Sequence, residues 1–327
     1  MSDERMHAVG ADPAWSESYY FNFVDPDSKI GMFTRMGFRP GNGWADALHV
    51  VYLPGRRVAF TYGRREIDAD LTRYDDDLKA GGLTLACIEP HQLWSIEYRG
   101  PAQDIPNPDI LLERRKSRPD GWYTPATLEM ELSFDCLTSP HFAAAGERGH
   151  FEQSGHVKGH IDLGGEHWQV DGYGVRDKSW GPRDWGAGNG QDMPKISQPS
   201  EGPTPFVNWF SMNFGQSAAL GGSCFRHSDG VMRGEGWLQR DGESIALKNV
   251  IIETDYAVDS ILHRSIRFNA ETGDGETINI SGEVLNVCPT KIAMPGGATF
   301  VNEGLVELRW EGRSGYGIAE HWHAVKL

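Results

Sequence analysis

The chain has 327 residues, which is more than one hydrophobic core usually serves, so we expect two domains. Hydrophobic residues at 39% and aromatic residues at 11% exclude a disordered chain. The formal net charge of -15 argues against nucleic acid as a partner, because such a protein repels phosphate backbones.

The chain shows no targeting or membrane-spanning segment. Residues 1–14 contain acidic groups and no apolar run, so they fit no signal peptide and are expected to form a tail. No stretch approaches the ~18 apolar residues of a spanning helix, so we expect no membrane insertion. These observations favour a cytoplasmic protein.

Short aromatic or β-branched runs bounded by Gly, Pro and Asp predict strands throughout the chain. In the first half they lie at residues 19–24, 49–53, 57–62 and 93–98, with a hairpin turn at Pro54-Gly55. In the second half they lie at residues 206–214, 230–238, 245–254, 276–287 and 305–310. Few segments have helical periodicity. Forty glycines between many short strands favour closed antiparallel sheets, which can enclose a ligand.

Residues 186–205 separate the two halves. They contain four Gly and four Pro without apolar periodicity, which indicates a linker or a lid. The expected organisation is a tail at 1–14, a first domain at 15–185, the linker or lid at 186–205 and a second domain at 206–327. The fold class is therefore all-β, with two antiparallel β-barrels in tandem.

The most unusual stretch is residues 170–186, here called the Arg-Asp segment. It contains Arg-Asp twice, at 176–177 and 183–184, and each pair is closely followed by a Trp. Upstream, two short strands flank Gly164-Gly165 as a hairpin, so we expect the second strand to deliver the segment to one end of a barrel.

An Arg can hold a carboxylate in a fixed fork, while a Trp wall lowers the local dielectric and raises the pKa of a carboxyl group. A protonated acid in this setting can donate a proton to an alkene or carbonyl, and an ionised neighbour can accept one. The alternative is structural, because ion pairs near glycine turns often only fix loops.

The pattern from Gly172 to Trp185 resembles the signature of bacterial proteins related to AttH and to carotenoid 1,2-hydratases. Residues 151–155 and 316–322 also resemble that family. The resemblance implies a tandem lipocalin-like fold, shared with tocopherol cyclase, kievitone hydratase and fungal Diels-Alderases. It further implies bulky hydrophobic substrates and no organic cofactor. Position 178 is Lys where the family often has His.

The motif positions that carry over from the resemblance are Arg176, Asp177, Trp180, Arg183, Asp184 and Trp185. We expect Asp177 to transfer the proton and Asp184 to be the more structural partner, with Arg176 and Arg183 tuning the two carboxylates. Glu152 is a candidate for the second acid-base group, and its alternative is a solvated surface residue.

His321 and His323 share one strand face about 6.6 Å apart, which makes His321 a candidate catalytic residue. The alternative is a pair of solvated or hydrogen-bonded histidines. No third metal ligand has a suitable spacing, so we expect no metal site.

The sequence therefore favours a cofactor-independent lyase or isomerase, of hydratase or cyclase type, for a terpenoid, steroid or aromatic metabolite. Phosphate loops, dinucleotide fingerprints and nucleophile elbows are missing, which is why no cofactor is expected. The candidate substrate-binding residues are Tyr173, Trp180, Trp185, Trp209, Trp322 and His323. A noncatalytic carrier of hydrophobic small molecules is the alternative function, and a homodimer is left open.

Overall fold

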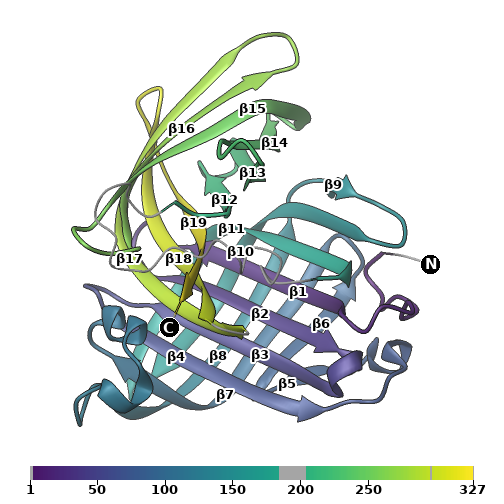
Figure 1. The fold of residues 1–327 in the computed structure, drawn as a ribbon, viewed down its shortest axis with the longest axis vertical. Coiled ribbons are helices and arrows are strands. Elements are labelled where there is room, and N and C mark those ends of the chain that lie inside the picture. The colour runs from purple at the N-terminus through teal and green to yellow at the C-terminus, as the bar shows by residue number, and fades with distance from the viewer. Residues whose placement is uncertain (1–2, 184–203, 295–296, 327) are drawn as a thin grey trace. The chain divides into compact units, whose positions relative to one another are not determined.

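The computed structural model describes residues 3–183, 204–294 and 297–326. The chain divides into two compact units, the first comprising Met1–Asn107 with Asp120–Arg183 and the second Pro108–Pro119 with Asp184–Leu327. The described residues form strands and four short 3-10 turns, so the predicted all-β class is confirmed (Figure 1). None of them forms a helix that is long and apolar enough to span a membrane.

In the first unit the strands follow the order β4-β3-β2-β1-β11-β10-β8-β7-β6-β5, and β9 pairs with β10. A further pairing of β4 with β7 bends this antiparallel sheet into a ring. The strands are β1 (Trp15–Val24), β2 (Gly31–Arg39), β3 (Trp44–Tyr52), β4 (Val58–Glu66), β5 (Leu78–Ala80), β6 (Leu83–Glu89), β7 (Leu93–Ile105), β8 (Thr124–Cys136), β9 (His141–Ala144), β10 (Gly149–Leu163) and β11 (Glu166–Pro182). The 3-10 turns η1 (Pro40–Asn42) and η2 (Leu71–Tyr74) complete it.

Side-chain alternation along the strands builds the core of this unit. Tyr19 and Phe21 on β1 point inward and lie 5.6 and 5.4 Å, ring to ring, from Trp94 on β7. Phe134 on β8 meets Phe21 edge to face at 5.4 Å. These aromatic contacts fill the ring interior, as expected for strands with one buried face.

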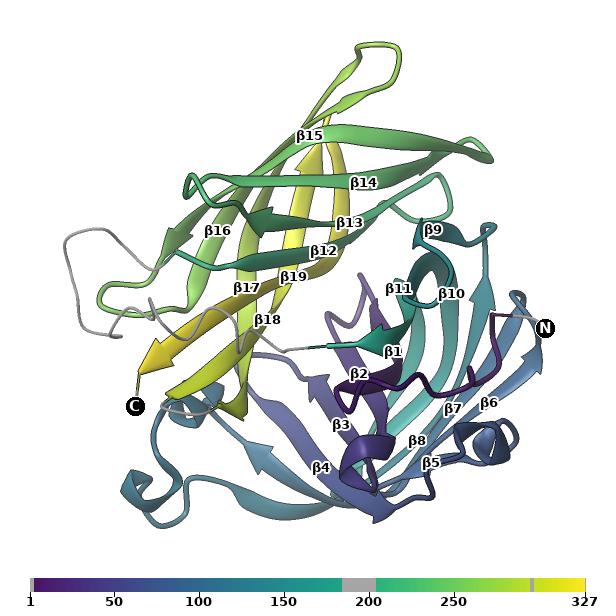
Figure 2. The ribbon, with the colours of Figure 1, turned by 45° about the vertical axis from the view of Figure 1, so that its right-hand side comes forward.

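The second unit is a closed barrel in which β12 to β19 follow one another and β19 pairs back with β12 (Figure 2). The strands are β12 (Val207–Asn213), β13 (Ala218–Arg226), β14 (Met232–Arg240), β15 (Glu243–Tyr256), β16 (His263–Thr272), β17 (Thr277–Met294), β18 (Gly297–Trp310) and β19 (Arg313–Lys326). The 3-10 turns η3 (Pro108–Leu112) and η4 (Arg115–Ser117) belong to this unit, and η3 lies against β17.

The barrel interior is apolar over most of its length. Phe210 and Phe268 meet edge to face at 4.9 Å, and Phe214 meets Trp310 at 5.3 Å. Every strand run that the sequence predicts coincides with an observed strand, and the turn at Pro54-Gly55 joins β3 to β4. Most of the predicted linker or lid, residues 186–203, lies outside the described residues.

Candidate functional site

The first thirteen residues of the Arg-Asp segment, 170–182, belong to one continuous strand. The sequence predicted that the second strand of the hairpin delivers this segment to one end of a barrel, whereas most of the segment is itself strand, because β11 runs from Glu166 to Pro182 between β10 and β1. The glycines serve close strand packing instead of a turn: a Cβ on Gly174 would lie 1.7 Å from the carbonyl oxygen of Asn22 on β1.

Strand alternation separates Arg176 from Asp177, so the predicted fork between them does not form. Arg176 points into the ring of the first unit, where its side chain is 1% exposed. Its Nη1 and Nη2 donate to the carboxylate of Glu4 at 2.9 and 2.6 Å. Its Nε and Nη2 donate to Oε1 of Gln153 at 2.8 and 2.6 Å. The carboxylate that neutralises Arg176 therefore comes from the N-terminal segment.

Lys178 and Trp180 lie on the same inner face as Arg176. The Lys178 ammonium donates to Glu17 Oε1 at 2.5 Å, and both side chains are fully buried. Trp180 Nε1 donates to the carbonyl of Gly146 at 2.9 Å, and its ring stacks on His7 with centroids 4.0 Å apart. The ring interior thus holds two compensated cations among aromatic side chains.

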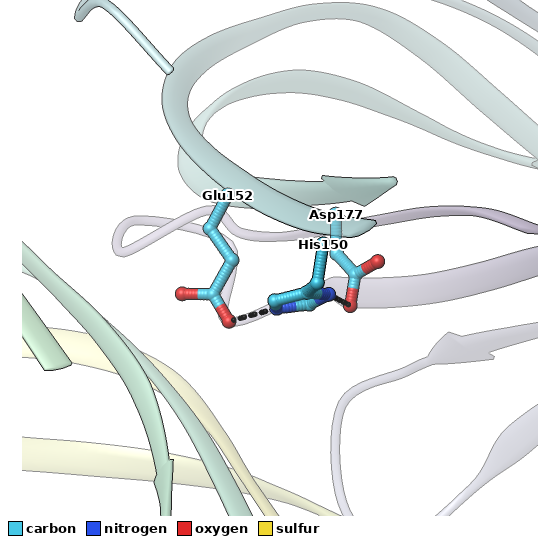
Figure 3. Close-up of side chains that lie close together, drawn as sticks. All are labelled: His150, Glu152 and Asp177. Atoms are coloured by element: carbon cyan, nitrogen blue, oxygen red, sulfur yellow. Dashed lines mark hydrogen bonds and ion pairs between the residues drawn. The ribbon is translucent and has the colours of Figure 1, made fainter. Parts of the chain in front are cut away.

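Asp177 points to the outer face of β11, where it meets His150 and Glu152 of β10 (Figure 3). His150 lies between the two carboxylates: its Nε2 is 3.0 Å from Glu152 Oε1 and its Nδ1 is 3.5 Å from Asp177 Oδ2. The structure therefore brings together Asp177 and Glu152, which the sequence singled out, and adds His150 between them. We call these three residues the His150 cluster.

The environment of the His150 cluster shifts two pKa values upward. Burial raises the pKa of Asp177, and the opposing charges of His150 and Arg183 do not cancel this effect. Burial alone would lower the pKa of His150, but the Asp177 charge and the Glu152 hydrogen bond raise it above its usual value. Oδ1 of Asp177 is buried and has no hydrogen-bond partner among the described residues. The Asp177 carboxyl group, whose pKa is raised, thus lies beside an imidazole whose pKa is also raised.

The His150 cluster also has the composition of a metal site. One ligand atom from each of the three side chains lies within 4.8 Å of the others, the only such group found among the described residues. One imidazole and two carboxylates suit several divalent ions. The expectation that no histidine site fits a metal did not include His150, so this cluster is where a metal has to be tested.

Two further predicted residues, Arg183 and Tyr173, belong to the first unit. Arg183 directly follows β11, its backbone N–H donates to the Ala14 carbonyl at 3.0 Å, and its charge lowers the pKa of Asp177. Tyr173 stacks on His156 with ring centroids 4.7 Å apart, four residues before Asp177 on the same strand. That separation is about 13 Å along a strand, so Tyr173 does not contact the His150 cluster. Asp184 and Trp185 lie outside the described residues.

The other predicted residues belong to the second unit. His321 and His323 share the inner face of β19, as alternation predicts, with ring centroids 6.4 Å apart. His263 on β16, which sequence reasoning missed, stacks on His321 at 4.1 Å. Burial lowers the pKa of His263 to about 4 and that of His323 to about 3, and lowers that of His321 in the same direction. The three imidazoles are therefore neutral at pH 7.

Trp209 and Trp322 do not share that inner face. Trp209 is 7% exposed and follows Asn208 on β12, whereas Trp322 meets Phe206 edge to face at 6.0 Å and donates its Nε1–H to Glu320. The structure thus places neither of these two residues on the face that carries His321.

Sequence reasoning also missed His150 and Glu4. A signal for His150 existed, because it lies two residues before Glu152 and side chains at that spacing share one face of a strand. Glu4 had none, since it meets Arg176 from 172 residues away.

The fold has solved relatives. A Nitrosomonas europaea protein, provisionally assigned as an AttH, has a TM-score of 0.57 and 14% identity over 97% of this chain and 96% of its own. Kievitone hydratase from Nectria haematococca has a TM-score of 0.55 and 8% identity over 100% and 92% of the two chains. CghA, solved with Sch210972, has a TM-score of 0.53 and 10% identity over 96% and 89%.

Identities this low establish a shared fold, and they confirm the predicted resemblance to AttH and kievitone hydratase at that level. No curated protein sequence matches the chain. One family matches residues 1–325, which is nearly the whole chain, and so the chain belongs to the family described as Domain of unknown function (DUF7064).

Proposed function

We propose that the protein is a lyase or isomerase, of hydratase or cyclase type, that moves protons at the His150 cluster to or from a hydrophobic small molecule without an organic cofactor. One observation carries the proposal. Asp177 offers a buried carboxyl oxygen that has no hydrogen-bond partner in the part of the chain that the structure describes, and burial raises the pKa of this carboxyl group. Both properties suit a general acid, which uses an oxygen that is not committed to another partner and a pKa raised toward the working pH.

His150 and Glu152 supply the rest of a proton relay. The imidazole approaches Asp177 with Nδ1 and Glu152 with Nε2, so a proton accepted on one nitrogen can leave from the other. Since the pKa of His150 is raised, the group stays protonated to higher pH, and the imidazolium is the proton source from which Asp177 is protonated again after each transfer.

In a hydration, the Asp177 proton forms a new C–H bond at one alkene carbon. A water oxygen then bonds to the other carbon, and the proton released from that water returns to the relay. In an isomerisation the second step is loss of a proton from the substrate to Glu152 or His150. Either sequence conserves protons and needs no redox partner.

The substrate class is supported by the relatives with this fold. One is named for the hydration of kievitone, and another was solved with the small molecule Sch210972. A terpenoid, steroid or aromatic metabolite is the corresponding class for this chain.

The test is to incubate the protein in D2O with an organic extract of the cells that encode it and to follow the extract by mass spectrometry. A metabolite that gains deuterium, or whose mass changes by one water, identifies the substrate. Asp177→Asn should then reduce its turnover by about 10²-fold or more, because the variant keeps the shape and removes the titratable proton. His150→Gln should reduce turnover by a similar order.

Asp162→Asn is the matched control, because Asp162 is a half-exposed carboxylate on β10 that binds His167 at 2.8 Å, away from the His150 cluster. It should leave turnover unchanged. Full turnover in Asp177→Asn would contradict the proposal. A metabolite that co-purifies and never changes would favour the carrier alternative. Activity lost in EDTA and restored by one divalent metal would show that the cluster works as a metal site.

A further inference from the structure

The inner face of β11 carries two buried cations whose carboxylate partners differ in origin. Lys178 is neutralised by Glu17, which belongs to the neighbouring strand β1. Arg176 is neutralised by Glu4, which belongs to no strand of the ring. The ring therefore supplies the carboxylate for Lys178 and leaves that for Arg176 to the N-terminal segment.

Residues Glu4–His7, here called the N-terminal strap, enter the core of the first unit without forming a strand. Glu4 and Met6 are 4% and 3% exposed and alternate with the exposed Arg5. The Glu4 carbonyl accepts from the Tyr19 hydroxyl at 2.9 Å, and the Arg5 carbonyl accepts from Lys178 at 2.8 Å. The strap is thus held by side chains of the ring and pairs with none of its strands.

The connection from the strap to β1 leaves it free to withdraw. Residues 8–14 are exposed and form no strand. Withdrawal would break the hydrogen bonds of the strap and leave every strand pairing of the ring intact. It would also leave the Arg176 guanidinium buried without a carboxylate, a state that is unfavourable unless another anion takes the place of Glu4.

The groups around the Glu4 carboxylate have the geometry of a carboxylate receptor. Arg176 donates from two nitrogens, and the His91 backbone N–H donates to Oε1 at 2.8 Å. Gln153 accepts from Arg176 and fixes the plane of the guanidinium. The Trp94 and Phe151 rings lie 5.4 and 5.1 Å from the guanidinium carbon. Two donors in a fork, a third donor and aromatic walls favour a carboxylate with an apolar body.

We propose that Arg176 and the His91 N–H form a binding site for an amphipathic organic acid, and that Glu4 occupies this site as an intramolecular ligand. Glu4 mimics the carboxylate of such an acid. Met6, two residues further along the strap, mimics its apolar body. Binding of the acid requires the strap to leave, so the strap competes with the ligand.

Octanoate is a suitable probe, because it combines one carboxylate with a short apolar chain. A variant that lacks residues 2–9 should bind octanoate at least about tenfold more tightly than the complete chain, since it has no strap to displace. 1-Octanol has the same chain length without the carboxylate, and it should bind both proteins more weakly than octanoate does. A peptide of residues 2–9 should compete with octanoate for the shortened protein. Isothermal titration calorimetry measures all three.

A second variant covers the case in which the shortened protein does not fold. Glu4→Gln in the complete chain keeps the strap but removes the charge opposite Arg176. Octanoate should raise its thermal midpoint by more than it raises that of the unaltered protein. Asp12→Asn is the control for the same charge change, because Asp12 is exposed and only caps the Ala14 N–H at 2.8 Å.

The proposal is overturned if octanoate stabilises neither Glu4→Gln nor the shortened protein, or if 1-octanol acts as well as octanoate. The strap would then be a fixed part of the fold. The result is independent of the His150 cluster, which lies on the opposite face of β11.

Discussion

The imidazole of His150 illustrates how neighbours outweigh burial at a single residue. Burial lowers its pKa, whereas the Asp177 charge and the Glu152 hydrogen bond raise it by more. A folded-state pKa raised above 6.5 stabilises the fold most fully below pH 6.5, and this contribution is lost as the pH rises through the raised pKa. The same pairing that prepares a proton relay therefore has a measurable titration.

Glu152→Gln should lower the pKa of His150 by about one unit, because it removes one of the two negative charges and keeps the shape of the side chain. NMR titration of the His150 imidazole measures this shift without a substrate. Asp162→Asn, which removes a carboxylate elsewhere on β10, should leave the His150 titration unchanged. If the pKa of His150 were the same in Glu152→Gln as in the unaltered protein, Glu152 would not contribute to the relay.

At the scale of one element, β11 combines two opposite faces with close contact to β1. Its glycines make this contact possible: Gly172 and Gly174 face the β1 backbone, and a Cβ on Gly172 would lie 2.6 Å from the Val24 carbonyl oxygen. Arg176 then points inward and Asp177 outward, on a strand held firmly on both sides.

Gly174→Ala should destabilise the first unit by about 3 kcal/mol, near the upper end of the usual cost of overpacking, because the methyl group would meet backbone that cannot turn aside. Thermal or guanidinium unfolding measures the loss. Gly273→Ala is the control, since a Cβ there meets nothing within 4 Å, and it should change stability little. If Gly174→Ala were as stable as Gly273→Ala, the backbones of β1 and β11 would not be in close contact at Gly174.

The strands were predictable from the sequence, and the partners of β11 were not. In runs such as residues 93–98, apolar and polar side chains alternate, which is typical of a half-buried strand, and these residues lie within an observed strand. The Arg-Asp segment was misjudged because its glycines resemble turn residues. Had the segment been interpreted as a strand, side-chain alternation alone would have placed Arg176 and Asp177 on opposite faces. Glu4 reaches Arg176 through the tertiary fold, for which a local pattern has no signal.

At the scale of the molecule, the two units contain different sets of buried titratable groups. The second unit buries three histidines with lowered pKa values, His263, His321 and His323. In the first unit burial lowers the pKa of His49 to about 3 and also lowers that of the half-buried His141, whereas the pKa of His150 is raised. In the first unit the histidines with lowered and with raised pKa values have opposite effects on how stability changes with pH. In the second unit all three histidines change stability in the same direction.

The second unit should therefore lose stability faster on acidification. Below pH 6.5 its histidines take up protons in the unfolded state, and in the folded state only near pH 4 and 3, so stability falls as the pH falls through this window. Calorimetry at pH 7, 6 and 5 should show the unfolding transition of the second unit moving down more than that of the first. His263→Asn should reduce this slope, and an unchanged slope would exclude His263 as its source.

The pairing of β19 with β12 also bears on how the protein is made. Sequential strands β12 to β18 can pair as they leave the ribosome, but until β19 emerges both β12 and β18 keep exposed edges. The final pairing joins segments more than 100 residues apart, as with Val207 and Trp322, and such contacts form slowly. During synthesis the nascent second unit is thus an open sheet with two unpaired edges, and pairing with other chains competes with folding until β19 is complete.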